Sequence, residues 1–395
     1  MQKQILRKNL TNILFITIFF SILIFSLGVA IFFPRDINYY ENRYNKKMIL
    51  PTAQTISDTS FQDTTEDALA DQIPKAQPLK KLYNTYTSNF VGSILKPMFE
   101  KNIDQYIRYK DTLFFGDQIV YSAYNLEEKK SDLDHKAENY NYIFEKYNQI
   151  DYYAYYIEKD TDINFETNEK IDADEYIFAQ LNLPDNQKAV FEINHYSDFQ
   201  KYFYKTDHHW NYAGSYKAYQ ELLVLLNCKD TPISAGKKVT VSKDFMGSKS
   251  SSAGFSFIKE PFYAYEFTTP KMTITMNGKK VSDYGEQQEF ISGSTSSTIT
   301  YGNFYGIDAG EIIFDTGDTS KENILVIGES YDNAVLKLLA SHFHITHSID
   351  LRNYEHFLGE KFNYEQYLKE HSIDKVLLIG NIDFYIKKEF NLENN

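Results

Sequence analysis

The sequence predicts an α/β fold in which helices cover both faces of a parallel sheet, giving three layers. Apolar runs at residues 324–327 and 375–379 end in turn residues, which is typical of parallel strands buried on both faces. In the middle of the chain, strand-like and helix-like runs alternate, as they do in α/β folds. Residues 240–322 break this alternation and predict a β-rich insertion.

Each element is predicted from its hydrophobic pattern and its turn residues. The expected strands cover residues 152–157, 189–193, 324–327, 345–351 and 375–379. The expected helices cover residues 132–147, 172–181, 213–226 and 333–340. In the insertion, residues 272–276 alternate strictly and end in Asn277-Gly278, which is the strongest short signal for a hairpin. The serine-rich stretches at 247–252 and 292–297 are expected to be loops.

The composition excludes several classes of protein. A chain of 395 residues with 43% apolar content can bury a large core, so global disorder is not expected. The net charge of −13 argues against nucleic acid as a partner, because binding to phosphates depends on clustered Lys and Arg. Cys228 is the single cysteine, which excludes an intrachain disulfide and a cysteine-based zinc cluster.

The N-terminal region predicts a membrane anchor. Residues 13–33 carry no charge and are long enough to cross a hydrocarbon layer of about 30 Å. Basic residues precede this run, so residues 1–12 are expected to form a cytoplasmic tail and the larger part of the chain to lie outside. Gly28-Val29-Ala30 resembles a signal-peptidase site, but the apolar run continues past it, which favours a retained helix. Residues 34–110 are expected to form a tether and N-terminal segment, and residues 111–395 the main domain.

A serine follows one of the buried strands at the edge where α/β sheets bind ligands. The run 324–327 leads into Gly328-Glu329-Ser330 and then into a predicted helix. Free backbone amides at such a turn, including that of Ser330, can stabilise an oxyanion. Asn381 follows the run 375–379, and its side-chain amide could be a second donor. Gly317-Asp318-Thr319-Ser320 has a similar composition, but it precedes the buried strand and is expected to be a loop.

A serine nucleophile needs a base, and the base needs a third group to orient it. The chain offers Asp207-His208-His209-Trp210. In an extended segment, Asp207 and His209 lie on one side and His208 lies on the other, so His209 is the expected base and Asp207 its partner. Alternatively, this run is a structural turn, or His208 and His209 are two ligands of a metal. No HxxxH or HxxEH spacing supports zinc.

Residues 204–214, Tyr-Lys-Thr-Asp-His-His-Trp-Asn-Tyr-Ala-Gly, resemble the signature of the DHHW family. That family is related to the SGNH hydrolase-like domains of alginate O-acetylation proteins, in which an Asp-x-His-Trp motif precedes a Gly-x-Ser block. The order of the motifs is that of a circularly permuted SGNH hydrolase. The resemblance implies an SGNH or flavodoxin-like sheet, with Ser330, His209 and Asp207 as the catalytic residues and no cofactor.

The resemblance also implies a function. It points to an O-acetyltransferase or acetylesterase that acts on a cell-surface or secreted polysaccharide, beside a membrane-bound O-acyltransferase that exports the acetyl group. Arg352, Trp210, Tyr331 and His208 are the candidate substrate-binding residues, although Arg352 could equally form a structural ion pair and Trp210 could pack in the core. A catalytically inactive scaffold for glycan binding or polymer assembly is the alternative, and a metal-dependent hydrolase is a third.

Overall fold

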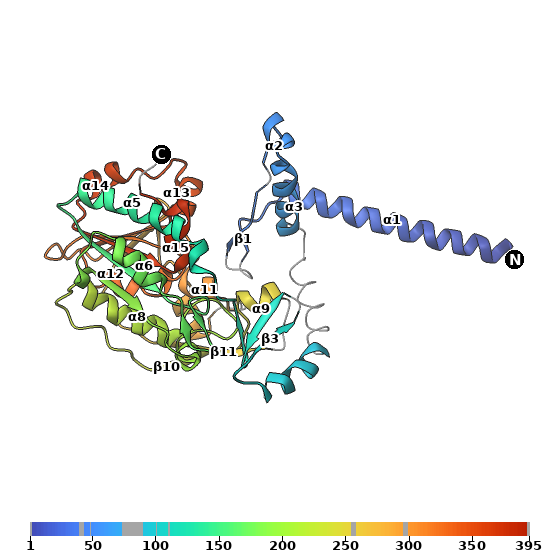
Figure 1. Cartoon of the computed structure of the whole chain (residues 1–395). Coiled ribbons are helices and arrows are strands. Elements are labelled where there is room, and N and C mark those ends of the chain that lie inside the picture. Colours follow the sequence, from blue (N-terminus) through green and yellow to red (C-terminus); the bar gives the residue numbers. More distant parts are fainter. Residues whose placement is uncertain are drawn as a thin grey trace.

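A mixed sheet of eight strands forms the centre of the protein (Figure 1). The computed structural model describes residues 2–38, 43–47, 49–72, 90–99, 101–109, 111–253, 258–294 and 299–392. From one edge of the sheet to the other, the strands are β13 (Lys279–Val281), β12 (Thr273–Met276), β14 (Glu311–Asp315), β16 (Ile345–Ile349), β15 (Ile324–Ile327), β17 (Lys375–Gly380), β6 (Asp151–Ile157) and β9 (Lys188–Phe191).

The five strands from β16 to β9 are parallel, and they confirm the strands expected from the apolar runs. The expectation of a wholly parallel sheet was wrong, because β14, β12 and β13 pair antiparallel. These three strands come from the segment that was expected to be a separate insertion. Asn277 and Gly278 both have positive φ, as a type I′ hairpin turn requires, and this turn joins β12 to β13 at the sheet edge.

The rest of the segment 240–322 is only partly β-structured. β10 (Lys238–Phe245) and β11 (Glu260–Tyr265) form a separate antiparallel pair. Three short helices lie in the same segment: α9 (Ser248–Ala253), α10 (Gln287–Ser292) and α11 (Tyr301–Tyr305). The expectation of a loop at 247–252 was therefore wrong. Lys249 and Ser250 of α9 are buried, so tertiary contacts hold a helix that the serine-rich sequence alone does not favour.

Helices cover both faces of the sheet, which gives the expected layers. On one face, Val326 and Leu377 pack in a cluster with α8 (Tyr212–Leu225) and α12 (Leu336–Ala340). On the other face, their neighbours Leu325 and Leu378 pack in a second cluster. This cluster involves α5 (Lys130–Lys146), α6 (Ala173–Gln180), α13 (Leu351–Leu358), α14 (Tyr364–His371) and α15 (Ile382–Ile386). Because successive strand residues point to opposite faces, apolar runs of this kind produce two buried faces.

The N-terminal part of the chain contains α1 (Gln2–Phe32), which extends away from the rest of the protein (Figure 1). Over the residues that the structure describes, no helix is both long enough and apolar enough to cross a membrane. The membrane span expected over residues 13–33 stays a prediction. Within the expected tether lie α2 (Ala53–Ser57) and α3 (Ser60–Gln72), and Thr52 caps α2. A small sheet of β3 (Tyr106–Tyr109), β4 (Thr112–Phe115) and β5 (Gln118–Val120) crosses the expected domain boundary at 110.

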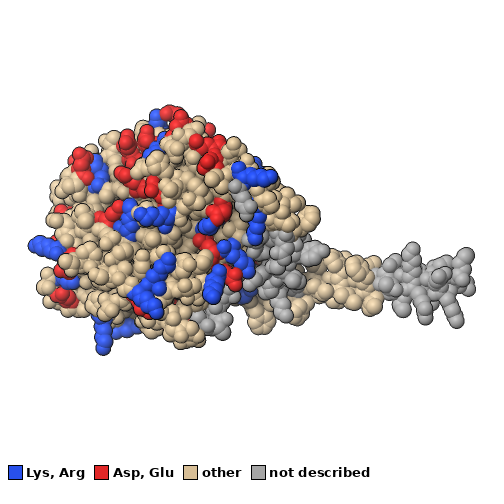
Figure 2. All heavy atoms as spheres, turned by 90° about the horizontal axis from the view of Figure 1, so that it is seen from below, with Lys and Arg blue, Asp and Glu red and all other residues tan. Residues whose placement is uncertain are grey.

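The face of the molecule drawn in Figure 2 carries both acidic and basic side chains, with more of the acidic ones toward the top of the view. On the face drawn in Figure 2, basic and acidic residues among those described are interspersed. Among the residues described on this face, no basic stripe appears of the kind with which proteins follow a phosphate backbone.

Helix α8 offers a test of the packing on its face of the sheet. Leu222 is fully buried in the core, whereas Val224 on the same helix is 81% exposed. We expect Leu222→Ala to lower the free energy of unfolding by about 2–5 kcal/mol, because it leaves a cavity in a packed core. Val224→Ala, the matched control, should change it by less than about 0.5 kcal/mol. Urea denaturation of both variants measures the difference, and equal effects would contradict this packing.

Candidate active site

Ser330 lies in the turn that follows strand β15. The turn continues into a short 3-10 helix, η3 (Asp332–Ala334), and then into α12. Gly328 begins the turn, and a Cβ atom there would lie 2.4 Å from Oδ2 of Asp332 and 2.9 Å from Cγ2 of Ile379, so a larger residue would have to displace these side chains. The backbone N–H of Ser330 donates to no residue within the described part of the chain. That N–H is therefore free to donate to a ligand, and its role at an oxyanion stays a prediction.

The structure brings the three predicted catalytic side chains together in one chain of hydrogen bonds. Oγ of Ser330 lies 2.8 Å from Nε2 of His209, although 121 positions separate the two residues in sequence. On the other side of the ring, Nδ1 of His209 lies 2.6 Å from Oδ1 of Asp207. These distances are within the range that proton transfer from a nucleophile to its base requires.

The Asp207–Trp210 segment is a bent loop and not the expected extended strand. A β-bridge between Phe203 and Trp210 closes the loop, and the backbone N–H of Tyr204 donates to the carbonyl of His209 at 3.2 Å. Asp207 and His209 nevertheless meet, because Oδ1 of Asp207 also accepts the backbone N–H of His209 at 3.1 Å. Asn211 then caps helix α8 by accepting the N–H of Ala213.

The segment that begins α9 supports the carboxylate of Asp207. The backbone N–H of Ser248 donates to Oδ2 of Asp207 at 2.8 Å, and that of Gly247 donates to Oγ1 of Thr206 at 2.9 Å. A Cβ atom on Gly247 would lie 2.3 Å from Cβ of Asp207, so only glycine allows this approach. Both carboxylate oxygens of Asp207 are thus held in place. Sequence reasoning missed this support, because the serine-rich composition gave no sign of it.

The electrostatics favour a charged carboxylate on Asp207. Burial disfavours the charge on Asp207, but His209 and His208 outweigh this effect and hold the pKa of Asp207 well below its ordinary value. Burial, together with the charge of His209, lowers the pKa of His208 well below its ordinary value. A charged carboxylate that accepts the Nδ1 proton leaves Nε2 free to act as a base.

Aromatic rings fix the plane of the His209 imidazole. The ring of Tyr301 stacks on it at 3.8 Å, with 2° between the planes, and the ring of His208 lies 3.8 Å from it at an angle of 37°. His208 thus lies beside His209, contrary to the expectation that it points away. Tyr301 is buried, and among 33 tyrosines no pattern in the sequence distinguishes it.

The side-chain amide of Asn381 does not lie free to bind an oxyanion. Its Nδ2 donates to Oε1 of Glu329 at 2.6 Å, and its Oδ1 accepts the N–H of Asp383 to cap α15. The expected role of Asn381 as a donor therefore disagrees with the geometry. The carboxylate of Glu329 is the better acceptor for this amide, and burial raises the pKa of Glu329.

Arg352 lies in an ion-pair network of α13 and the loop before β14. Its guanidinium binds Asp350 at 2.6 Å and Asp308 at 2.9 Å, and lies 4.0 Å from Glu329. Burial raises the pKa of Asp308 to about 6, and Arg352 opposes that increase. These contacts occupy Arg352 as a structural ion pair, which is one of the two alternatives that the sequence left open.

Two of the predicted substrate-binding residues are in the core. Trp210 is 0% exposed and packs 5.5 Å from Phe191, so it presents no surface to a sugar. Tyr331 is 1% exposed and donates its hydroxyl to the carbonyl of His208 at 2.5 Å, so it holds the loop rather than lining a pocket. Of the four candidates, the side chain of His208 is 30% exposed, and its Nδ1 lies 2.7 Å from Oγ of Ser248.

A metal ion would have to compete for groups that already have partners. Ligand atoms of Asp207, His208 and His209 lie within 4.8 Å of one another. Both ring nitrogens of His209 are bonded, one to Asp207 and the other to Ser330. The geometry therefore suits a nucleophile, base and orienting carboxylate better than a metal cluster.

Glu260 gives a pH test of the loop that holds Asp207. Its Oε1 accepts the N–H and the hydroxyl of Thr206, both at 2.9 Å, and burial raises its pKa to about 7. Because the folded pKa is raised, the wild type loses stability as the pH rises through 7. Glu260→Gln keeps the acceptor and removes the charge, so at pH 8 it should be more stable than wild type by about 1–3 kcal/mol. At pH 5, thermal unfolding should show little difference, and an unchanged pH profile would contradict this account.

Solved structures of other proteins are similar in fold to this chain. A DHHW family protein from Eubacterium siraeum has a TM-score of 0.56 and 15% sequence identity, and the match covers 72% of this chain and 95% of that one. PatB1 from Bacillus cereus, solved with a sulfonyl adduct, has a TM-score of 0.56 and 17% identity, and the match covers 73% of this chain and 99% of that one. No curated protein matches the chain.

A match to a family model identifies the family of the chain. The family model described as DHHW protein matches residues 126–349, which is more than half of the chain and includes both the Asp207–Trp210 loop and Ser330. The chain belongs to the DHHW family.

Proposed function

We propose that this protein is an extracytoplasmic O-acetyltransferase or acetylesterase that acts on a polysaccharide through an acyl-enzyme on Ser330. The observation that carries the proposal is the continuous hydrogen-bonded series from Ser330 through His209 to Asp207. A buried hydroxyl, imidazole and carboxylate at these distances form the set that acyl transfer needs.

In the first half of the reaction, Oγ of Ser330 attacks the carbonyl carbon of an acetyl ester. Nε2 of His209 takes the hydroxyl proton, and the charge of Asp207 stabilises the imidazolium. The free N–H of Ser330 donates to the oxyanion of the tetrahedral intermediate. The intermediate collapses when the C–O bond to the donor alcohol breaks, and His209 returns its proton to that oxygen. Ser330 then carries the acetyl group.

In the second half, an acceptor hydroxyl replaces the donor alcohol. His209 takes the acceptor's proton while the acceptor oxygen attacks the acetyl carbon, and Ser330 leaves with that proton. A sugar hydroxyl as acceptor gives acetylated polysaccharide, and water gives hydrolysis. Ser330 is only 8% exposed to solvent, so the site limits the access of water to the acetyl carbon.

The cellular setting forms part of the same proposal. Residues 13–33 carry no charge and follow basic residues, which supports a single-pass anchor with the main domain outside the cell. A membrane-bound O-acyltransferase that exports acetyl groups would supply the donor. A polysaccharide of the cell surface, or one that is secreted, would be the acceptor.

The proposal predicts the effect of removing the nucleophile. Ser330→Ala should reduce hydrolysis of 4-nitrophenyl acetate to the level of uncatalysed reaction with buffer, because no acyl-enzyme can form. Ser320→Ala, in the exposed Gly317–Ser320 loop, is the matched control and should hydrolyse the ester like wild type. Unchanged turnover in Ser330→Ala, with an unchanged circular dichroism spectrum, would end the proposal.

The orienting role of Asp207 predicts a second loss. Asp207→Asn keeps the size of the side chain but removes the charge that fixes the Nδ1 proton of His209. We expect kcat for the same ester to fall by about 10³–10⁴-fold, while KM changes little. The protein should still fold, because Asn can accept the N–H of Ser248. A fall of less than tenfold would show that Asp207 does not orient the base.

A further inference from the structure

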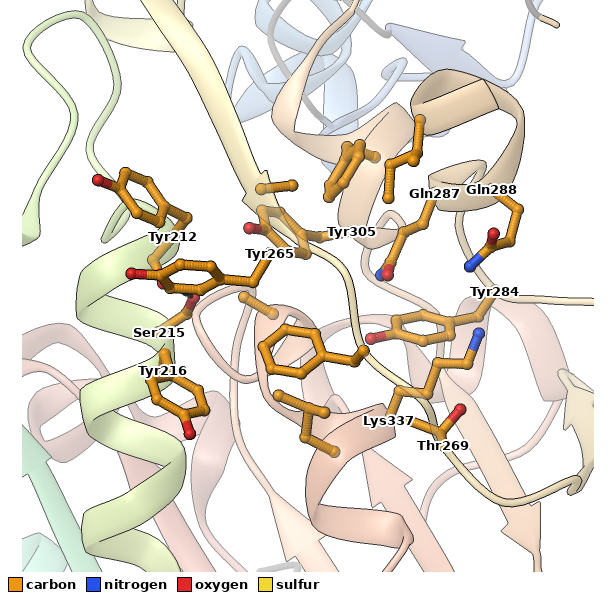
Figure 3. Close-up of a pocket in the computed structure, with 16 residues that line it drawn as sticks. Tyr212, Ser215, Tyr216, Tyr265, Thr269, Tyr284, Gln287, Gln288, Tyr305 and Lys337 are labelled. Atoms are coloured by element: carbon orange, nitrogen blue, oxygen red, sulfur yellow. Dashed lines mark hydrogen bonds between the residues drawn. The ribbon is translucent and has the colours of Figure 1, made fainter. Parts of the chain in front are cut away.

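A second feature of the domain is a pocket lined by tyrosines, which we call the tyrosine pocket (Figure 3). Its tyrosines are Tyr212, Tyr216, Tyr265, Tyr284 and Tyr305. They come from α8, β11, α11 and the loop before α10. Two of these elements also border the candidate active site, because α8 follows the Asp207–Trp210 loop and α11 carries Tyr301.

The tyrosine pocket connects to the candidate active site through the neighbouring rings of Tyr305 and Tyr301. The ring of Tyr305 lies 4.9 Å from that of Tyr301, and the ring of Tyr301 stacks on His209 at 3.8 Å. Ala334 and Lys337, a few residues after Ser330, also line the pocket. The pocket is thus a near neighbour of the catalytic groups but contains none of them.

The aromatic walls are held in fixed positions. The ring of Tyr265 packs edge-on against Tyr212 at 5.0 Å and against Tyr216 at 5.7 Å. The hydroxyl of Tyr216 is bonded to the carbonyl of Ile233 at 3.2 Å. Rings that are held in this way offer preformed apolar faces, and they lose little entropy when a ligand binds.

Unused hydrogen-bonding groups accompany these rings. The side-chain amides of Gln287 and Gln288, and the hydroxyls of Tyr265 and Thr269, have no hydrogen-bond partner among the residues that the structure describes. Figure 3 shows the amide of Gln287 turned toward the middle of the pocket. Amides both donate and accept, so they match hydroxyl groups, which do the same.

The charge of the pocket argues for a neutral ligand. Lys337 is the charged residue of its lining, and its ammonium group is paired with Asp283 at 2.5 Å. A phosphate or carboxylate would have to compete with Asp283 for this cation. Aromatic faces, unpaired amides and a neutralised charge together match a sugar, which has apolar C–H faces and many hydroxyls.

The size of the pocket fits a sugar that rests at its mouth. The pocket offers about 50 Å³ of space and is open to solvent. For comparison, a cavity of about 150 Å³ holds a benzene ring. This space therefore accepts one small substituent of a sugar, such as a hydroxymethyl group, while the sugar ring lies outside it against the tyrosines.

We propose that the tyrosine pocket binds a neutral sugar residue of the polysaccharide acceptor and so holds the chain beside Ser330. This inference rests on the proposed function for the identity of the acceptor. The binding itself does not require Ser330, so the two proposals can fail separately.

Binding to neutral oligosaccharides tests the inference. The probes are hexasaccharides of glucose, N-acetylglucosamine and galactose, with galacturonate hexasaccharide as the anionic comparison, titrated into the full chain by calorimetry. We expect at least one neutral probe to bind, and to bind at least tenfold more weakly to Tyr265→Ala and to Gln287→Ala. Val224→Ala, on the exposed face of α8, is the matched control and should bind like wild type.

Two further readouts separate this site from the catalytic one. Ser330→Ala should bind the neutral probe normally, and Val224→Ala should hydrolyse 4-nitrophenyl acetate like wild type. Sugar binding that depends on Tyr265 and Gln287 in a protein without esterase activity would sustain this inference and refute the proposed function. Binding of no neutral probe, or equal binding by wild type and both pocket variants, would overturn the inference.

Discussion

The hydrogen bond between Ser330 and His209 is the interaction on which the candidate site depends. It joins a turn late in the chain to a loop 121 positions earlier, so only the folded sheet can bring the two groups within 2.8 Å. The strand β15 fixes the turn, and the β-bridge between Phe203 and Trp210 fixes the loop. The geometry that the proposed chemistry needs therefore depends on the stability of the central sheet.

Most of the polar groups near this bond serve to hold it rather than to meet a substrate. Ser248 and Thr206 position the two sides of the Asp207 loop, and Asn381 is occupied by Glu329. Tyr301 stacks on the ring of His209 on one side, and on the other side it contacts Tyr305 of the tyrosine pocket. A buried, preorganised site of this kind needs little reorganisation during the reaction. Electrostatic stabilisation is most effective under that condition.

The sequence predicted the parts of the molecule that depend on local pattern. The apolar runs located β15 and β17, and the Asp-x-His order indicated that Asp207 and His209 meet, although the segment is bent and not extended. It could not predict the antiparallel edge of the sheet or helix α9, since both depend on contacts between distant segments. Trp210 and Tyr331 were misplaced for a related reason: an aromatic residue next to a catalytic group packs beneath it or lines a pocket, and only tertiary structure decides which.

The covalent state of Ser330 during turnover tests the central claim most directly. Wild-type protein and a His209→Ala variant would be mixed with an acetyl ester, quenched in acid within one turnover, digested and examined by mass spectrometry. The account predicts that the peptide containing Ser330 gains the mass of one acetyl group in the wild type and not in the variant. Acetylation at another residue, or ester turnover without any acetylated peptide, would contradict it.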